Sequence, residues 1–202
     1  MKKRLCTMIT AILCITFLLV GCGAESAKTG VWDSNVFTNE WLNFKMTVPE
    51  DSRIMTKDEM SSAIGTLEST YINGGDEENL SKYANIYDCM VILPDGMSSI
   101  QLIYENTAKT TAGKNIKAEE YLDILKEQLT TAGSDYVLSD PTTKELAGRT
   151  FTFMSTTFSG GAAIQDYYLV KEGNYMATML ISYPSTYQST IDEIISSITT
   201  AK

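Results

Sequence analysis

The feature that most constrains the fold lies near the C-terminal end, where three long segments rich in β-branched and aromatic residues follow one another. They span residues 149–158, 163–171 and 175–183. Short glycine-containing turns, Ser159-Gly160-Gly161 and Glu172-Gly173-Asn174, separate them. Glycine adopts the positive φ angles that tight hairpin turns require. This stretch therefore predicts three adjacent strands of an antiparallel meander.

A second antiparallel pair is expected upstream, in residues 86–93 and 98–105. The turn signal Pro94-Asp95-Gly96 joins them. The first strand reads IYDCMVIL and is apolar on both faces apart from Asp88. A strand that is buried on both sides needs other elements packed against both faces of its sheet.

Three amphipathic helices are expected around this sheet, each with one apolar stripe. A capping box of Thr56 and Glu59 begins the first helix, Gly133 is expected as the C′ residue of the second, and Ser185 caps the third. The stripes are Met60, Ala63, Ile64, Leu67 and Tyr71; Ala118, Tyr121, Leu122, Leu125 and Leu129; and Tyr187, Ile191, Ile194, Ile195 and Ile198.

Shorter elements complete the expected order. Residues 36–38 and 42–48 form a first hairpin that ends at Pro49, because Leu42, Phe44, Met46 and Val48 alternate with polar residues. The remaining segments are a short helix in 76–83 and short strands in 136–139 and 144–146.

The N-terminal segment predicts export and a lipid anchor. Three cations, Lys2, Lys3 and Arg4, precede an apolar run that ends in Leu19-Val20-Gly21-Cys22. This arrangement is typical of a secretory signal, and its end resembles the bacterial lipobox. The resemblance implies cleavage between Gly21 and Cys22 and a diacylglycerol thioether on Cys22. The alternatives are an uncleaved membrane anchor and an ordinary cleaved signal, but the apolar run is short for a membrane span.

These features divide the chain into a cleaved signal peptide (1–21), a lipidated cysteine with a flexible tether (22–35) and one globular domain (36–202). Removal of the three signal cations changes the formal net charge from −9 to −12. So acidic a protein is not expected to bind nucleic acid or to adhere to anionic lipid through charge. The membrane partner is therefore reached through the lipid on Cys22, on the outer face of a bacterial cell membrane.

Histidine is absent from the sequence. This excludes Ser-His and Cys-His catalysis and histidine-containing zinc sites. Cys89, the one thiol left after export and lipidation, is expected to be a buried core residue. The acidic run Asp76-Glu77-Glu78 is interpreted as carboxylates that complement the helix dipole at a helix N-terminus. It lacks the alternating oxygen ligands of a calcium-binding loop. No catalytic residue, metal or cofactor is predicted.

The order of elements resembles the PsbP/Mog1-like domain found in small bacterial lipoproteins. The resemblance covers residues 36–200 and is carried by Pro49, the helix around Glu119-Glu120-Tyr121-Leu122, the turn Leu146-Ala147-Gly148-Arg149, the meander and the last helix. One departure is Glu50-Asp51-Ser52-Arg53, where such domains often carry a small residue and an aromatic one. The resemblance implies an α+β fold with a central antiparallel β-sheet and amphipathic helices on both faces, an α/β/α sandwich. It implies little about activity.

Three classes of function remain open. The first is a non-catalytic binding or assembly module with an unknown protein partner, to which tyrosines of the C-terminal third contribute if they lie at the surface. The second is a receptor for a small molecule. The third is a carboxylate-dependent hydrolase of cell-envelope glycans. The candidate acids of the hydrolase class are Glu105, Asp166 and Glu172. The candidate surface tyrosines of the binding-module class are Tyr167, Tyr168, Tyr175, Tyr183 and Tyr187.

The lipid anchor has a direct test. Replacement of Cys22 by Ala removes the sulfur nucleophile, so the variant is expected to lose palmitate labelling completely and to leave the membrane fraction. The measurement is metabolic labelling with radioactive palmitate followed by sedimentation of membranes. Cys89→Ala is the matched control and should label as the wild type does. Labelling of Cys22→Ala contradicts the lipobox interpretation.

Overall fold

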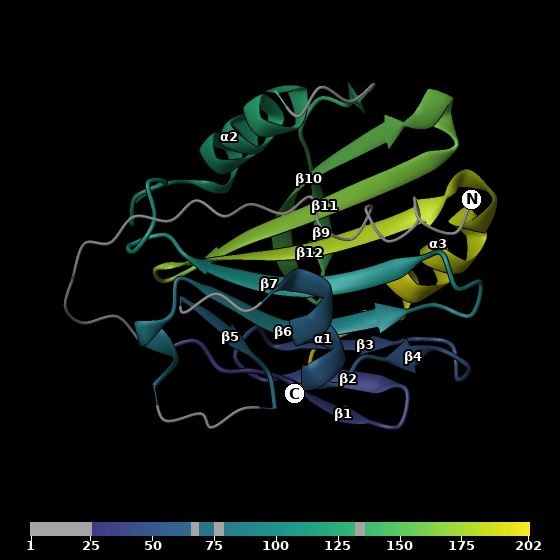
Figure 1. Cartoon of the computed structure of the whole chain (residues 1–202), viewed down its shortest axis with the longest axis horizontal. Helices are drawn as coiled ribbons and strands as arrows, with labels where there is room; N and C mark the ends of the chain where they lie inside the picture. The colour runs from purple at the N-terminus through teal and green to yellow at the C-terminus, as the bar shows by residue number, and fades with distance from the viewer. Residues whose placement is uncertain (1–25, 66–68, 75–78, 132–135) are drawn as a thin grey trace.

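The computed structural model describes residues 26–65, 69–74, 79–131 and 136–202. These residues form a nine-stranded sheet, a three-stranded sheet and three α-helices (Figure 1). The strands are β1 (Val31–Asp33), β2 (Val36–Asn39), β3 (Phe44–Thr47), β4 (Arg53–Ile54), β5 (Thr70–Ile72), β6 (Asn85–Ile92), β7 (Ser99–Asn106), β8 (Val137–Leu138), β9 (Thr142–Leu146), β10 (Arg149–Phe158), β11 (Ala163–Glu172) and β12 (Tyr175–Pro184). The helices are α1 (Lys57–Ile64), α2 (Ala118–Thr131), α3 (Gln188–Ser196) and the 3₁₀ turns η2 (Leu80–Lys82), η3 (Ser159–Gly161) and η4 (Ser185–Tyr187).

The large sheet has the strand order β4-β6-β7-β12-β11-β10-β8, with β5 also paired to β6 and β9 also paired to β10. All of its pairs are antiparallel except β5 with β6. The expected meander β10-β11-β12 and the expected hairpin β6-β7 are both confirmed. The meander pairs with the hairpin through β12 and β7, which the turns between neighbouring strands do not reveal.

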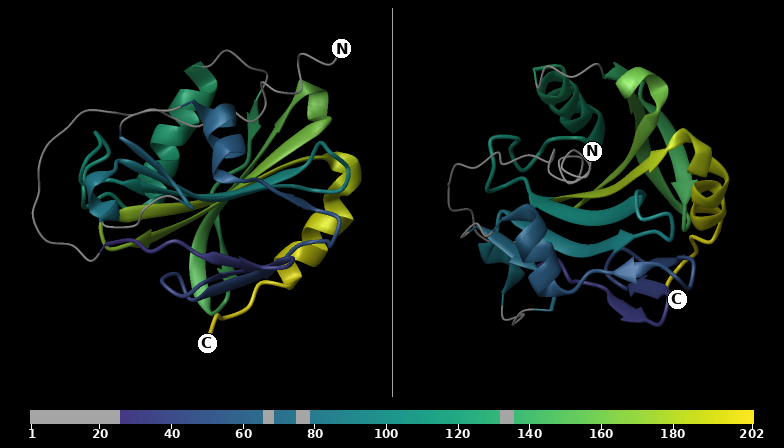
Figure 2. Two further views of the ribbon diagram at one scale, coloured as in Figure 1. Left: turned by 60° about the horizontal axis from the view of Figure 1, so that its bottom comes forward. Right: turned by 45° about the vertical axis from the view of Figure 1, so that its right-hand side comes forward.

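Helices α1 and α2 pack on one face of the large sheet, which we call the helical face (Figure 2). Leu122, Leu125 and Leu129 of α2 join Met154 and Leu180 in one apolar cluster. Met60 of α1 belongs to a second cluster over β6 and β7. The apolar stripes predicted for these helices therefore do face the sheet.

The three-stranded sheet β1-β2-β3 and helix α3 share the opposite face. Phe37 of β2, Met46 of β3 and Ile191 of α3 belong to the largest apolar cluster of the molecule, together with Ile100 and Met179 of the large sheet. An antiparallel bridge between Lys45 and Thr199 ties the small sheet to the segment after α3. The expected α+β class, with a central antiparallel sheet and helices on both faces, is confirmed, and the small sheet is an addition to it.

Two expected helix boundaries are wrong. Helix α1 has the predicted capping box of Thr56 and Glu59 but ends at Ile64, and Gly65 follows with φ 78°. Tyr71, expected on the helix stripe, is instead buried in β5 beside β6. Because β5 pairs with a long central strand, its tertiary hydrogen bonds replace helical ones. The expected helix positions Leu67, Asp76 and Gly133 lie outside the described residues.

The last helix also begins later than expected. Ser185 does not cap it; the 3₁₀ turn η4 comes first and leads directly into α3. Its stripe is otherwise as predicted, since Ile191, Ile194 and Ile198 are buried.

Part of the range 22–35, which was expected to be a flexible tether, belongs to the folded domain. Strand β1 lies within that range and pairs with β2, and Ala27 is only 2% exposed. Gly30 makes this packing possible, because a Cβ there would lie 2.3 Å from the Phe37 ring. The ordered domain therefore begins before residue 36.

A β-bulge places Asp88 at the centre of a buried hydrogen-bond network. Tyr87 pairs with Ile103 and Cys89 with Leu102, so Asp88 is the extra residue of β6. Its Oδ1 accepts hydrogen bonds from the Gly30 N–H at 2.8 Å and from Asn73 Nδ2 at 3.0 Å.

The second oxygen of Asp88 is used equally fully. Oδ2 accepts hydrogen bonds from Asn39 Nδ2 at 2.9 Å and from the Tyr104 hydroxyl. Asp88 is 1% exposed, so its four donors replace the water that a carboxylate otherwise needs. This network joins the segment before β1 and the residue after β5 to β2, β6 and β7.

We expect Asp88→Asn to lower the free energy of unfolding by at least about 2 kcal/mol, because one carboxylate oxygen becomes an NH₂ group, which cannot accept hydrogen bonds from the buried donors that face it. Urea denaturation followed by tryptophan fluorescence measures the change. Asp123→Asn, at an exposed position of α2, is the matched control and should stay within about 0.5 kcal/mol of the wild type. Equal stability of the two variants would show that the network contributes little.

Candidate functional site

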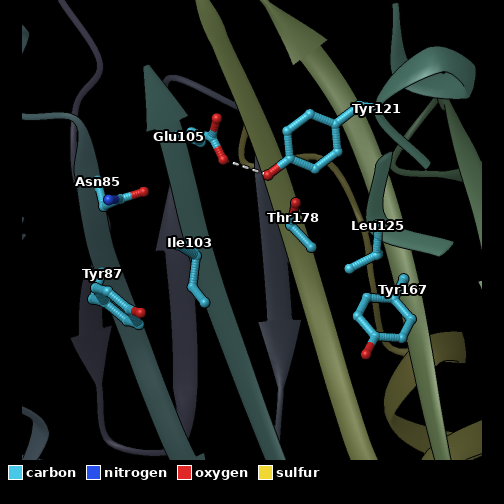
Figure 3. A pocket seen from close by; sticks show the side chains of 8 residues that line it. All are labelled: Asn85, Tyr87, Ile103, Glu105, Tyr121, Leu125, Tyr167 and Thr178. Carbon is cyan, nitrogen blue, oxygen red and sulfur yellow. Dashed lines mark hydrogen bonds between the residues drawn. The ribbon is translucent and has the colours of Figure 1, made fainter. Parts of the chain in front are cut away.

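A small cavity on the helical face is the candidate site (Figure 3). Strands β6, β7, β11 and β12 form its floor, and α2 forms one wall. The alternation of strand side chains sends every second residue of β7 and β12 to this face, which brings polar and apolar groups together. The lining residues are Asn85, Tyr87, Ile103, Glu105, Tyr121, Leu125, Tyr167 and Thr178.

Glu105 is the acidic group of the cavity and is 5% exposed. Its Oε1 accepts a hydrogen bond from Thr110 Oγ1 at 2.5 Å, and its Oε2 accepts one from the Tyr121 hydroxyl at 2.5 Å. Tyr121 comes from α2 and Thr110 from the loop before it. The carboxylate thus fixes both the helix and its leading loop to β7.

Burial and the Glu105 charge raise the pKa of the Tyr121 hydroxyl well above its ordinary value, so Tyr121 stays a hydrogen-bond donor. Lys171 of β11 donates a hydrogen bond to Thr107 Oγ1. Burial lowers the pKa of Lys171 to about 8, and the nearby Glu105 opposes that shift. Lys171 is therefore partly neutral in mildly alkaline solution.

The dimensions of the cavity limit what it can hold. The space open to the centre of a water-sized sphere is about 20 Å³. One water molecule needs roughly 10–15 Å³ of such space. The cavity therefore accommodates about one water, which Asn85 and Thr178 can bind. Among the described residues, no group of three acidic, histidine or cysteine side chains is placed to hold a metal ion.

The three candidate acids of the hydrolase alternative do not form a catalytic pair. Glu105 lies on the helical face, whereas Asp166 lies on the opposite face, where its Oδ2 accepts a hydrogen bond from the Tyr183 hydroxyl at 2.8 Å. Burial raises the pKa of Asp166, and hydrogen bonds from Ser155 and Tyr183 oppose that shift. Glu172 forms an ion pair with Arg149 at 2.5 Å. Each acid thus stabilises a different part of the fold.

The tyrosines of the C-terminal third are mainly core residues. Tyr167, Tyr168, Tyr175 and Tyr183 are each 5% exposed or less, and only Tyr187 is partly exposed. They do not form the surface cluster that was considered for partner binding. Cys89 is buried and free, and burial beside Asp88 raises its thiol pKa well above the ordinary value, as expected of an unreactive core cysteine.

Sequence reasoning did not single out Thr110, Tyr121 or Lys171 as partners of Glu105. Tyr121 was expected only as a member of the α2 stripe, and Lys171 only as the end of a strand. The signal in the sequence that could have indicated this grouping is the change from apolar to charged residues at the ends of neighbouring strands. Its meaning depends on the register of β7, β12 and β11, which no local pattern specifies.

Comparisons with known proteins find similarity of backbone shape only. No protein-family model matches the chain, and no curated protein matches it. The solution structure of cyanobacterial PsbP (CyanoP) from Synechocystis sp. PCC 6803 aligns with a TM-score of 0.48 and 12% identity, covering 90% of this chain and 98% of that one.

Two further structures align at 12% identity. LpqN of Mycobacterium tuberculosis, described as involved in cell envelope biogenesis, has a TM-score of 0.41 and coverages of 77% of this chain and 82% of its own. A protein from Bacteroides thetaiotaomicron has a TM-score of 0.39, and the aligned part covers 84% of this chain and 49% of that protein. These similarities assign no activity, ligand or partner to the present chain.

The predicted signal peptide, Gly21 and the predicted lipidation residue Cys22 lie outside the described residues. None of the helices in the described part of the chain is long and apolar enough to cross a membrane. Lipid attachment at Cys22 therefore stays a prediction from the sequence.

The Lys171 pKa predicts a pH dependence of stability. An unfolded lysine keeps its proton up to about pH 10.4, whereas Lys171 of the folded protein releases it near pH 8. Between these values the unfolded state binds more protons, so this group makes the free energy of unfolding rise with pH. Lys171→Met should remove that rise.

The measurement is urea denaturation of the wild type and Lys171→Met from pH 7 to about pH 9.5, because exposed tyrosines ionise near pH 10. The stability difference, wild type minus variant, should increase above pH 8. Lys57→Met, at an exposed position, is the control and should give a constant difference. A constant difference for Lys171→Met as well would mean that the lysine is not desolvated.

Proposed function

We propose that this protein is an extracytoplasmic lipoprotein, anchored through Cys22, that acts as a non-catalytic binding or assembly module for another protein of the cell envelope. The anchor rests on the pattern Leu19-Val20-Gly21-Cys22 and on the cations before it. The first described residue, Ser26, lies only four positions after Cys22. The domain is then held close to the membrane surface from which its partner is recruited.

The small size of the cavity is the observation that carries the binding proposal. A space for about one water is far below the roughly 300–1,000 Å³ of a typical ligand pocket. This favours recognition on the surface over a small-molecule receptor. The receptor is kept as the alternative, and it requires the cavity to open.

The arrangement of acids argues against the hydrolase alternative. Hydrolysis of a glycosidic bond needs two carboxyl groups about 5–9 Å apart on either side of the substrate. Glu105 and Asp166 face opposite sides of the sheet, and the oxygens of Glu105 are both hydrogen-bonded. The absence of histidine from the sequence removes the commonest general base.

Exposed apolar side chains identify where contact with a partner can be tested. Val31 of β1, Met97 of the β6–β7 turn and Val137 of β8 are 67%, 54% and 69% exposed. They lie on separate elements, so each reports on a different surface of the domain. Contiguous apolar patches, rather than single side chains, mark protein interfaces, so these three residues serve as probe positions on three surfaces.

The test is photo-crosslinking in intact cells with a photoreactive amino acid at Val31, Met97 or Val137. The same protein should be recovered repeatedly as an adduct from at least one of these positions, with at least a fivefold lower yield from the control position Thr130, which is exposed on α2. The yield should fall when Cys22→Ala releases the domain from the membrane. If none of the positions gives a protein adduct while a small molecule raises the melting temperature of the purified domain, the receptor alternative is correct.

A further inference from the structure

One end of the domain combines the N-terminal attachment point with a group of lysines. The segment from residue 26, the 3₁₀ turn η2, the β11–β12 turn and the loop 107–117 all lie at this end, which we call the tether end (Figures 1 and 2). Hydrogen bonds connect these segments. The Thr107 N–H donates to the Asn174 carbonyl at 2.9 Å, and Asn106 Nδ2 donates to the Ser81 carbonyl at 3.4 Å.

The chain enters the domain at this end and is fixed there. Asn39 Nδ2 donates a hydrogen bond to the Lys28 carbonyl at 3.0 Å. Two residues further on, the Gly30 N–H donates a hydrogen bond to Asp88 Oδ1. Ser26 lies four positions after Cys22. A fully extended chain of that length spans only about 14 Å. A lipid on Cys22 would therefore keep the tether end within one or two Debye lengths of the bilayer, each about 8 Å at physiological salt.

The loop 107–117 carries three lysines and no acid, in a chain whose mature charge is strongly negative. Lys114 and Lys117 are exposed and Lys109 is partly exposed; Lys28 and Lys82, elsewhere at the tether end, are exposed as well. Within the described part of the chain, the ion pairs involve Arg53 and Arg149 and none of these lysines.

Some acids of the same end are buried or hydrogen-bonded within the protein, although Glu119 and Glu120 remain exposed to solvent. Glu105 is buried and hydrogen-bonded, and Glu172 is paired with Arg149. Glu120 accepts a hydrogen bond from the Lys117 N–H at 3.0 Å, and Glu119 lies 3.4 Å from the Thr152 hydroxyl. Glu40 is exposed, and Asp76, Glu77 and Glu78 lie outside the described residues.

We propose that the tether end rests on the anionic phospholipid headgroups of the membrane that holds the lipid anchor, with Lys28, Lys82, Lys109, Lys114 and Lys117 as the contacting residues. This inference rests on the proposed anchoring at Cys22. The acyl chains supply attachment, while the lysines select one orientation and point the β6–β7 turn away from the bilayer. The remaining surface, which is strongly acidic, is repelled by the same headgroups.

The electrostatic attraction between these lysines and the anionic headgroups is strong enough to orient the domain. A lysine close to an anionic membrane surface shifts the ratio of docked to undocked molecules about fivefold. Three lysines in one loop therefore shift that ratio by roughly a hundredfold. Because the anchor confines the domain to the surface, this charge has only to set the orientation and does not have to supply the binding.

The experiment uses the lipidated full-length product in vesicles and compares two fluorophore positions. Asn115→Cys carries the label in the loop 107–117, and Met97→Cys carries it at the opposite end. Energy transfer to a headgroup acceptor should be clearly higher from Asn115→Cys in phosphatidylglycerol-containing vesicles. The difference should shrink in pure phosphatidylcholine, at high salt, and in a variant with Lys109, Lys114 and Lys117 all changed to Gln.

A variant with Lys45, Lys57 and Lys126 changed to Gln is the matched control and should keep the difference. Vesicle flotation of each variant tests the anchor separately. Loss of flotation in the wild type would contradict the anchoring at Cys22. Normal flotation with equal transfer from both labels, or with a difference that ignores lipid charge and the loop lysines, would overturn the proposed orientation and leave the anchor intact.

Discussion

The buried carboxylate of Asp88 is the interaction on which the rest of the structure depends. An acceptor-only group at this depth is tolerable only if donors replace its water, and here four neutral donors do so. They come from Gly30, Asn39, Asn73 and Tyr104, so one side chain fixes four distant segments relative to β6. The small sheet is thereby joined to the large one by a polar contact as well as by apolar packing.

This contact also decides how the N-terminal segment behaves. A tether of fourteen residues would let the domain move freely over the membrane, whereas the hydrogen bond to Gly30 places the ordered part of the chain much closer to Cys22. Gly30 is required there because the Phe37 ring leaves no space for a Cβ. The Asp88 carboxylate on β6 therefore determines how near the domain lies to the lipid expected on Cys22. It thereby also determines which end of the domain lies within the range of the membrane's electrostatic potential.

The sequence predicted the long elements well because each contains its own periodic signal. The meander β10-β11-β12 has alternating side chains and glycine turns, and α2 has an uninterrupted stripe of leucines, so local pattern and final structure agree. Strands β1 and β5 are only three residues long, and their pairing depends on partners far away in sequence. Tyr71 illustrates the limit of prediction from local patterns. Its spacing fits the apolar stripe of a helix, but in the structure its segment pairs with β6 as strand β5.

The candidate site shows the same limit in a sharper form. The sequence named Glu105 and Asp166 as acids on strands, and both are indeed buried on strands. Their separation follows from register alone: Glu105 pairs with Met176 and Asp166 with Ile181, two positions of β12 that point to opposite faces. A shift of one residue in either pairing would have put both acids on one face. The difference between a catalytic pair and two structural carboxylates is thus a property of long-range pairing, which no residue type reveals.

The surfaces left for a partner follow from what the fold already covers. Helices α1 and α2 pack on the helical face, beside a cavity for about one water, and the small sheet and α3 pack on the other face. With the tether end on the bilayer, the regions open to a partner include the opposite end, strand β1 with Val31, strand β8 with Val137 and the edge strand β9. That edge carries Lys144 and Glu145, charges of the kind that discourage indiscriminate strand pairing. A partner that adds a strand at β9 would have to match this pair of charges, whereas one that binds the opposite end would meet the apolar Met97 first.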